Sequence, residues 1–269
     1  MFLDPIFLVI QVLNALQLAS LLFLLSVGLS VVYGLMNFIN LAHGTLYMLG
    51  AFIGLTIVRE SESFWVALLI APVAIGFLGA LLHILLLRRM QAVSPMKQVL
   101  VTFGLLFVGL DVVRYIWGDY SHAIDPPALF SKSVLIFGEL YPSYRLFVIA
   151  VGLLIFFVLY LGLERTRLGA VVRAGVDERE IAMSLGLNIE LAFFLVFCLG
   201  CGLAGLAGVV AAPVFSVYPG MDMSILVNLL KVQSRGSFMK KRVYEVNVKY
   251  LLVQAKRPLE YQKDKSTHY

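Results

Sequence analysis

Residues 5–58 contain no Asp, Glu, Lys or Arg, and this uncharged stretch limits what the chain can fold into. A helix needs roughly 20 apolar residues to cross about 30 Å of hydrocarbon, so the stretch is too long for one crossing and suits two. The whole chain is 61% hydrophobic and 14% charged, against about 45–50% and about 25% in ordinary soluble domains. This composition excludes a water-soluble enzyme, a disordered chain and a disulfide scaffold, and it predicts a polytopic membrane protein.

The other apolar runs complete the prediction of an all-α, polytopic transmembrane bundle with about six spans. Polar residues near 37–44 separate the first two spans, so we expect a broken or polar-interrupted helix there. The opening segment is interpreted as a span and not as a secretory signal, because it lacks a basic n-region and an obvious cleavage site. The predicted spans are 8–33, 44–58, 64–87, 98–117, 144–163 and 190–212.

The Lys and Arg residues of the short loops predict the orientation of these spans. The loops 88–97 and 164–189 carry three and four basic residues, whereas 59–63 and 118–143 carry one each. Both basic loops fall on the same side if six spans alternate, and the positive-inside rule makes that side cytoplasmic.

Polar residues gather at the break between the first two spans. Asn37, Asn40, His43 and Gly44 lie within eight residues of one another. An interrupted helix at membrane depth is tolerated only where it lines a cavity or is buried in protein, and its free N-terminus carries a positive dipole end. The residues therefore predict either part of a solute pathway or a plain cytoplasmic turn, in which Asn and Gly are common.

Small residues at helical spacing indicate where helices touch. They permit close backbone approach in a membrane, within this subunit or against a partner. The residues predicted to pack in this way are Gly50, Gly54, Gly200, Ala204 and Gly208.

The predicted cytoplasmic loop 164–189 contains start and stop signals for a short helix at about 178–185. A second candidate helix lies at 169–174. Asp177 is the predicted N-cap and Glu180 completes a capping box, while Gly186 supplies the stop. We expect Ile181, Ala182 and Leu185 to share one apolar face. A two-turn helix is marginal alone in water, so this face is predicted to lean on the bundle or on a soluble partner.

The sequence predicts no catalytic residue, metal site or cofactor. It has no phosphate-binding G-x-x-x-x-G-K-[ST] motif, so any ATP that powers the protein must be hydrolysed by another chain. Cys198 and Cys201 form a C-x-x-C spacing inside a span, but without a second pair they are interpreted as small buried hydrophobes.

Three separated motifs resemble the permeases of branched-chain amino-acid ABC importers. They are YGLMNFINLAHGTLYMLGA at 33–51, RTRLG at 165–169 with its continuation to Asn188, and GLAGLAGV at 202–209. The resemblance covers about 1–230, the predicted transmembrane permease domain. It implies a multi-pass subunit of the bacterial cytoplasmic (inner) membrane, in contact with membrane lipid and not with nucleic acid.

The resemblance also implies partners and site residues. The expected partners are a second permease subunit, two ATP-binding subunits and a periplasmic solute-binding protein. The break at 37–44 would line the translocation pathway, and 164–189 would be the coupling loop seated in a groove of the ATPase. The loop residues that match the motif are Arg167, Gly169, Arg173, Ala174, Asp177, Glu180, Ala182 and Gly186.

The chain departs from the family in its basic polar tail, 231–269. Residues 1–230 hold 11 Lys and Arg against 13 Asp and Glu, whereas the tail holds 10 against 3. Family members continue past about 225 with a Gly-rich segment and further spans, which this tail cannot form. We favour a shifted reading frame or a truncated copy. The alternatives are a cytoplasmic extension returned by a re-entrant segment around 213–230, or a tail that binds anionic lipid.

The sequence as a whole predicts a permease subunit that carries the route for branched-chain amino acids or similar small solutes and leaves ATP hydrolysis to a separate subunit. One alternative is a permease for urea or another small polar solute. The other is a non-transporting membrane scaffold or assembly subunit.

Overall fold

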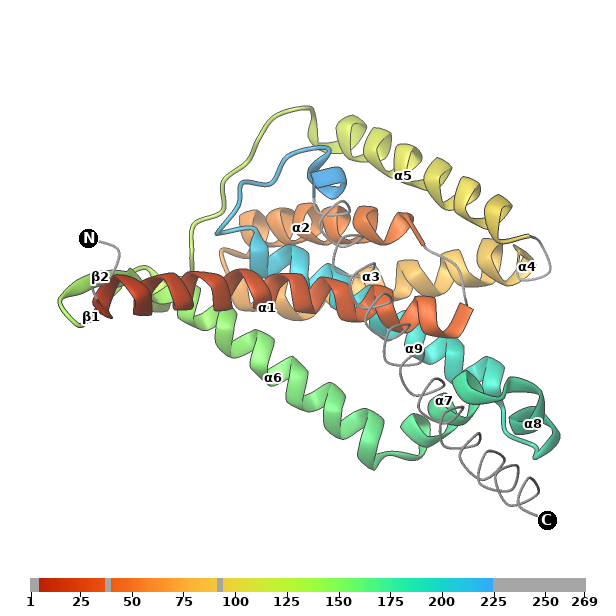
Figure 1. The fold of residues 1–269 in the computed structure, drawn as a ribbon. Helices are drawn as coiled ribbons and strands as arrows, with labels where there is room; N and C mark the ends of the chain where they lie inside the picture. Colours follow the sequence, from red (N-terminus) through yellow and green to blue (C-terminus); the bar gives the residue numbers. More distant parts are fainter. Residues whose placement is uncertain (1–4, 37–39, 91–93, 225–269) are drawn as a thin grey trace, which may run out of the picture. The chain divides into compact units, whose positions relative to one another are not determined.

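The computed structural model describes residues 5–36, 40–90 and 94–224, and the basic tail lies outside these ranges. The described chain is almost entirely helical (Figure 1). Its long helices are α1 (Pro5–Met36), α2 (Ala42–Ser61), α3 (Phe64–Leu82), α5 (Pro95–Trp117), α6 (Ser143–Arg165) and α9 (Ile189–Ala211). The shorter elements are a π-helical turn (His83–Leu87), α4 (Arg88–Met90), a 3₁₀ turn (Ala128–Phe130), β1 (Ser133–Ile136), β2 (Glu139–Pro142), α7 (Arg167–Asp177) and α8 (Arg179–Ser184).

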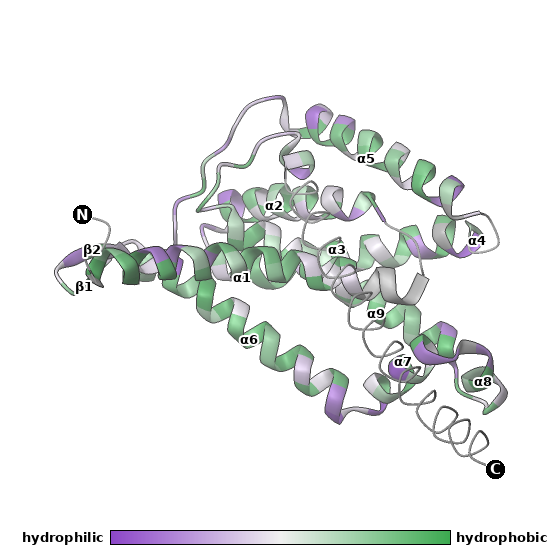
Figure 2. Cartoon of the chain, in the orientation of Figure 1, coloured by the Kyte–Doolittle hydropathy of each residue, from purple (hydrophilic) through white to green (hydrophobic). Residues whose placement is uncertain are grey.

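Five helices in the described part of the chain are long and apolar enough to cross a membrane, so the protein is a polytopic helical membrane protein. They are Ile6–Ser30, Phe64–Met90, Met96–Trp117, Ser143–Arg165 and Ile189–Ala211. The remaining predicted span, 44–58, is also helical, because it lies within α2. However, α2 is not among the five helices that are apolar enough to count as candidate membrane spans. Large apolar side chains such as Leu69, Val73 and Phe77 of α3 are exposed, as expected where lipid takes the place of water. The long helices consist mostly of hydrophobic residues (Figure 2).

The core of the bundle is built around α9. This helix packs against α1, α2 and α3, and it is the most buried of the five candidate spans. α6 lies against α1, and α5 lies against α2 (Figure 1).

Small residues allow α9 to approach its neighbours at backbone distance. A Cβ placed on Gly50 of α2 would clash with the backbone of Gly205 in α9, and a Cβ on Gly54 would lie 2.8 Å from Val209. Gly208 faces the backbone of α2, and Ala204 is fully buried. The predicted packing residues therefore lie in helix contacts within this chain.

The connection between α5 and α6 forms an antiparallel hairpin of β1 and β2, with Val134 paired to Tyr141. It closes over the start of α1, because the side-chain carbonyl of Asn14 accepts hydrogen bonds from Tyr141 Oη at 3.3 Å and Arg145 Nη1 at 2.8 Å. At the end of α5, Arg114 pairs with Asp119 at 3.2 Å.

Substituting Gly50 by Ala tests the backbone contact between α2 and α9. We expect the variant to lose about 1–3 kcal/mol of stability, because an added methyl group must force two helix backbones apart. Gly104→Ala in α5 is the matched control, since a Cβ there meets nothing within 4 Å. Thermal unfolding of the purified chain in detergent would measure both, and equal behaviour of the two variants would contradict the packing described.

Candidate functional site

The break between α1 and α2 is the first part of the candidate site. α1 ends at Met36 and α2 begins at Ala42, and the predicted site residue Asn37 lies outside the described residues. Asn40 is buried, and its side-chain carbonyl accepts a hydrogen bond from Ala42 N at 3.1 Å. Its main-chain carbonyl accepts one from His43 N at 3.2 Å. Such an Asx turn satisfies N–H groups that the start of a helix leaves without partners, so Asn40 helps to fix where α2 begins.

This break lies well inside the bundle and not at its end. The N–H of Leu41 donates to the hydroxyl of Thr102 at 3.3 Å, and Thr102 lies about two turns inside α5. The His43 ring lies beside Gly28, which contacts Gly200, the middle residue of α9. A turn at the surface would instead lie near the end of the bundle, where Arg88 of α4 pairs with Glu190 in the first turn of α9. The position is thus the kind at which an irregular backbone must be buried in protein or line a cavity.

His43 is fully buried where α1 and α9 cross. A Cβ built on Gly28 would lie 2.6 Å from the carbonyl oxygen of Gly200 and 2.9 Å from the His43 ring, so the crossing depends on glycine. Neither nitrogen of the ring has a well-formed hydrogen bond among the described residues. A buried polar group without a partner costs about 1–3 kcal/mol, and a polar solute or water that reached the ring would relieve that cost.

Asp222 completes the site from a distant part of the sequence. The chain after α9 turns back along the bundle, where Val217 exchanges two backbone hydrogen bonds of 2.8 Å with His122. It then reaches the first turn of α2, where Asp222 is fully buried. Asp222 Oδ2 accepts a hydrogen bond from the Thr45 hydroxyl at 3.4 Å, and its Oδ1 has no partner among the described residues. We call Asn40, His43, Thr45 and Asp222 the helix-break site.

Gly44 explains how this carboxylate can come so close to α2. A Cβ on Gly44 would lie 3.3 Å from the carbonyl oxygen and 3.5 Å from the Cβ of Asp222. The N-terminus of a helix favours a negative charge, because its free N–H groups carry partial positive charge. Asp222 lies outside the five candidate spans. Burial raises the pKa of its carboxyl, and hydrogen bonds from the backbone N–H of Met223 and from the Thr45 hydroxyl partly oppose this rise.

Asp222 and Thr45 were not predicted from the sequence as members of the helix-break site, nor was the contact of Thr102 with Leu41 beside it. A signal for Asp222 was available, because it is the only charged residue between Glu190 and Lys231. Nothing in the sequence placed it against α2, since the contact with Thr45 joins residues 177 positions apart.

Polar and aromatic side chains continue along α2 from the helix-break site towards Arg59. Trp117 Nε1 donates to the Thr56 hydroxyl at 2.8 Å, and Arg59 Nη2 lies 3.1 Å from His122 Nδ1. Phe52 packs against both the Trp117 and the His122 rings. This end of α2 therefore presents hydrogen-bonding groups beside aromatic surface.

The loop 164–189 forms two helices, α7 and α8. Thr166 caps α7 by accepting a hydrogen bond from Gly169 N at 3.1 Å. Asp177 is the last residue of α7, and α8 begins at Arg179 without a side-chain cap, so the predicted capping box is wrong. Gly186 ends α8 with a φ of 79°, with the N–H groups of Gly186 and Leu187 bonded to Met183 and Ala182. This is the predicted glycine stop, in the form of a Schellman motif.

The two faces of this loop have different surroundings. Val172, Ala182 and Ala174 belong to an apolar cluster with the start of α9. Gly169 has no room for a side chain against Leu163, whereas Arg173 bonds the Leu163 carbonyl and lies 3.9 Å from Glu164. Ala182 is buried against the start of α9 whereas the side chains of Ile181 and Leu185 are exposed, so the prediction that the three share one face is wrong. Ala182 of α8 faces α9, whereas the larger side chains of Ile181 and Leu185 point away from it. Arg167, Asp177 and Glu180 are also exposed.

The two cysteines are free thiols in α9. Cys201 is buried against Gly79 of α3, and Cys198 is partly buried. In the described ranges, no group of three or more His, Cys, Asp or Glu side chains could hold a metal ion.

Comparison with known proteins identifies the family to which this architecture belongs. The family described as branched-chain amino acid transport system / permease component matches residues 11–231. The chain belongs to this family. It is therefore a transport component, and the polar break and the α7–α8 loop must be interpreted as parts of a permease.

Individual relatives are distant but cover most of the chain. The high-affinity branched-chain amino acid transport system permease protein LivH of Salmonella typhimurium is 24% identical over 219 residues, 77% of this chain and 71% of the relative. The corresponding BraD of Pseudomonas aeruginosa is 26% identical over 227 residues, 78% of this chain and 73% of its own. The probable LivH of Methanocaldococcus jannaschii is 23% identical over 236 residues, 83% of this chain and 72% of its own. No solved structure matches the chain.

Replacing Asp222 by Asn tests whether its charge is needed for folding. We expect the free energy of unfolding to stay the same or rise, because an amide keeps the hydrogen bond from Thr45 and costs less to bury than a carboxylate. Thr45→Val should lower it by about 1 kcal/mol, because it removes the donor. Thermal unfolding in detergent measures both, and strong destabilisation by Asp222→Asn would mean that the charge itself holds α2 in place.

Proposed function

We propose that this chain is the membrane permease subunit of an ATP-driven importer that moves branched-chain amino acids or similar small solutes across a bacterial cytoplasmic membrane. Family membership and the printed function of the LivH and BraD relatives support the solute class. The observation that carries the proposal is the polar helix break, which is buried beside the middle of α9. Burying polar groups within a membrane protein is energetically costly, and such groups usually mark a solute or ion pathway.

The helix-break site has the charge pattern that an amino-acid zwitterion requires. The Oδ1 atom of Asp222 is available to accept from an ammonium group, and the first turn of α2 with the His43 ring can receive a carboxylate. Asp222 now lies against that first turn. The solute therefore enters only when the segment around Asp222 withdraws from α2, which is a gate between the two sides of the membrane.

The exposed face of α7 and α8 is proposed as the contact with an ATP-binding subunit. Its apolar part is Val176, Ile181 and Leu185, with Asp177 and Glu180 beside them. The opposite face of the same helices packs on the start of α9. A push on this loop by the ATPase would therefore reach the helix whose middle contacts the helix-break site. A second permease, two ATP-binding subunits and a solute-binding protein complete the proposed importer.

Uptake by the assembled importer tests the solute site. In proteoliposomes that contain the chain with its partner subunits, we expect Asp222→Asn to reduce ATP-dependent uptake of labelled L-leucine about tenfold or more, since a lost charge-assisted contact is worth roughly 1.5–3 kcal/mol. Asp119→Asn is the control, because Asp119 is an exposed carboxylate of the α5–α6 connection. Normal uptake by Asp222→Asn would reject the proposed solute site. Uptake of urea in place of leucine would reject the solute class.

Co-purification tests the docking loop. Reversing two charges with Asp177→Lys and Glu180→Lys should abolish retention of the ATPase, because the exposed face of α7–α8 would become basic beside Arg167. Asp125→Lys with Glu139→Lys makes the same charge change in the exposed α5–α6 connection and should leave retention unchanged. Equal retention by both double variants would place the ATPase elsewhere.

A further inference from the structure

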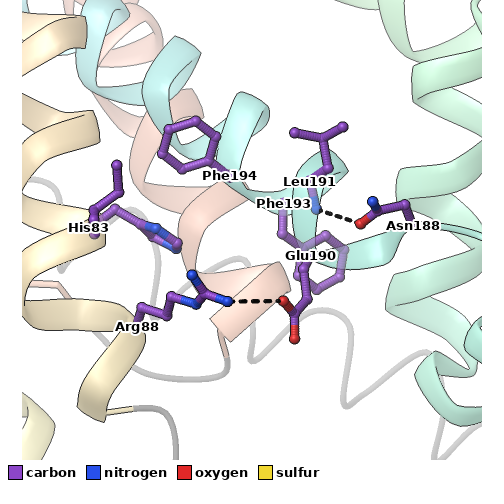
Figure 3. A pocket seen from close by; sticks show the side chains of 8 residues that line it. His83, Arg88, Asn188, Glu190, Leu191, Phe193 and Phe194 are labelled. Carbon is purple, nitrogen blue, oxygen red and sulfur yellow. Dashed lines mark hydrogen bonds and ion pairs between the residues drawn. The ribbon is translucent and has the colours of Figure 1, made fainter.

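A polar cavity lies at the end of the bundle, where α4 follows α3 and α9 begins. Its volume is about 340 Å³, and its lining includes His83, Ile84, Arg88, Glu190, Leu191 and Phe194 (Figure 3). This end carries the basic loops, so the orientation predicted from them makes the cavity cytoplasmic. Arg88 and Glu190 flank the start of α9, and neither belongs to the helix-break site.

Opposite charges face each other across the cavity. Arg88 Nη2 lies 3.8 Å from Glu190 Oε2, and both side chains are largely exposed. An exposed pair at this distance contributes little to stability. Each partner can therefore exchange the other for a better-placed ligand charge, and a guanidinium binds a carboxylate well because two N–H groups can bond it in parallel.

His83 provides a second, independent indication of a ligand. The residue is 6% exposed, and neither of its ring nitrogens has a hydrogen-bond partner among the described residues. Its ring lies 5.3 Å from the rings of Phe194 and Phe197, and Figure 3 shows it directed into the space between Arg88 and α9. A ligand atom in that space would satisfy a buried polar group that is otherwise costly.

Apart from Asn188, the remaining wall of the cavity is apolar. Ile84, Leu191, Phe193 and Phe194 line it, and ligand cavities of about 300–1,000 Å³ typically combine such walls with a few polar groups that fix orientation. The cavity therefore offers one positive group, one negative group and an aliphatic pocket beside them.

We propose that this cavity binds a free α-amino acid with an aliphatic side chain, reached from the cytoplasm and separate from the translocation route. Arg88 binds the carboxylate with a hydrogen bond from His83, Glu190 binds the ammonium group, and Leu191 and Phe194 contact the side chain. The choice of leucine as the probe rests on the proposed transport function, whereas the zwitterion chemistry rests on the cavity alone.

Equilibrium binding of labelled L-leucine to the full chain in lipid nanodiscs tests the proposal. We expect saturable binding that Arg88→Gln and Glu190→Gln each weaken at least about tenfold, as the loss of one charge-assisted contact predicts. Arg89→Gln is the matched control, since Arg89 is the exposed neighbour that does not line the cavity. Leucinol lacks the carboxylate and 4-methylpentanoate lacks the ammonium group, so both should compete at least tenfold more weakly than leucine.

Three results would overturn the proposal. They are the absence of saturable binding, equal weakening by Arg88→Gln and Arg89→Gln, or binding that only Asp222→Asn removes. The last result would leave leucine at the helix-break site and would support the proposed function while rejecting this cavity. Conversely, binding lost in Arg88→Gln, in a chain whose importer moves no leucine, would support the cavity and reject the proposed function.

Discussion

The close backbone contacts of α9 are the constraint on which the rest of the structure depends. The hydrophobic effect does not bring helices together within a lipid bilayer, so helix association depends on close packing and polar contacts. Gly28 against Gly200, and Gly50 against Gly205, let α1 and α2 approach α9 without intervening side chains. These contacts hold α1 and α2 against α9, and the His43 ring lies beside the Gly28–Gly200 contact.

Enclosing the break places the Asp222 carboxyl against the first turn of α2. The first turn of α2 presents partial positive charge inside the bundle, and the segment after α9 brings a carboxylate to it. The arrangement is only partly satisfied, because His43 and Asp222 Oδ1 lack partners among the described residues. A buried polar network with unpaired members contributes little to the stability of the fold, because each unpaired group is costly to bury. This incomplete hydrogen bonding supports the proposal that a solute binds here, and Asp222 occupies the position in this conformation.

Much of the helical architecture could be predicted from the sequence, and the site only in part. The spans predicted from the uncharged stretch and the other apolar runs begin and end within a few residues of α1, α2, α5, α6 and α9, and the span at 64–87 covers α3 and the π-helical turn. This succeeded because the length of an apolar segment is a local property of the sequence. The break near Asn40 was also local. Asp222 could not be placed, since its partner is distant in sequence. The errors at Ile181 and Leu185 arose because packing of α8 against the start of α9, not the spacing of apolar residues, decided which side each residue faces.

The central claim is that the break at the start of α2 is reached by water and solute during transport. Modification of a cysteine at Thr45 by a small, membrane-impermeant thiol reagent tests this most directly, in a chain whose Cys198 and Cys201 are replaced by Ala. The account predicts that Thr45→Cys reacts during ATP-driven turnover and is protected by L-leucine, whereas Val73→Cys on the lipid-exposed face of α3 does not react. A Thr45→Cys chain that transports leucine yet stays unreactive under all conditions would contradict it.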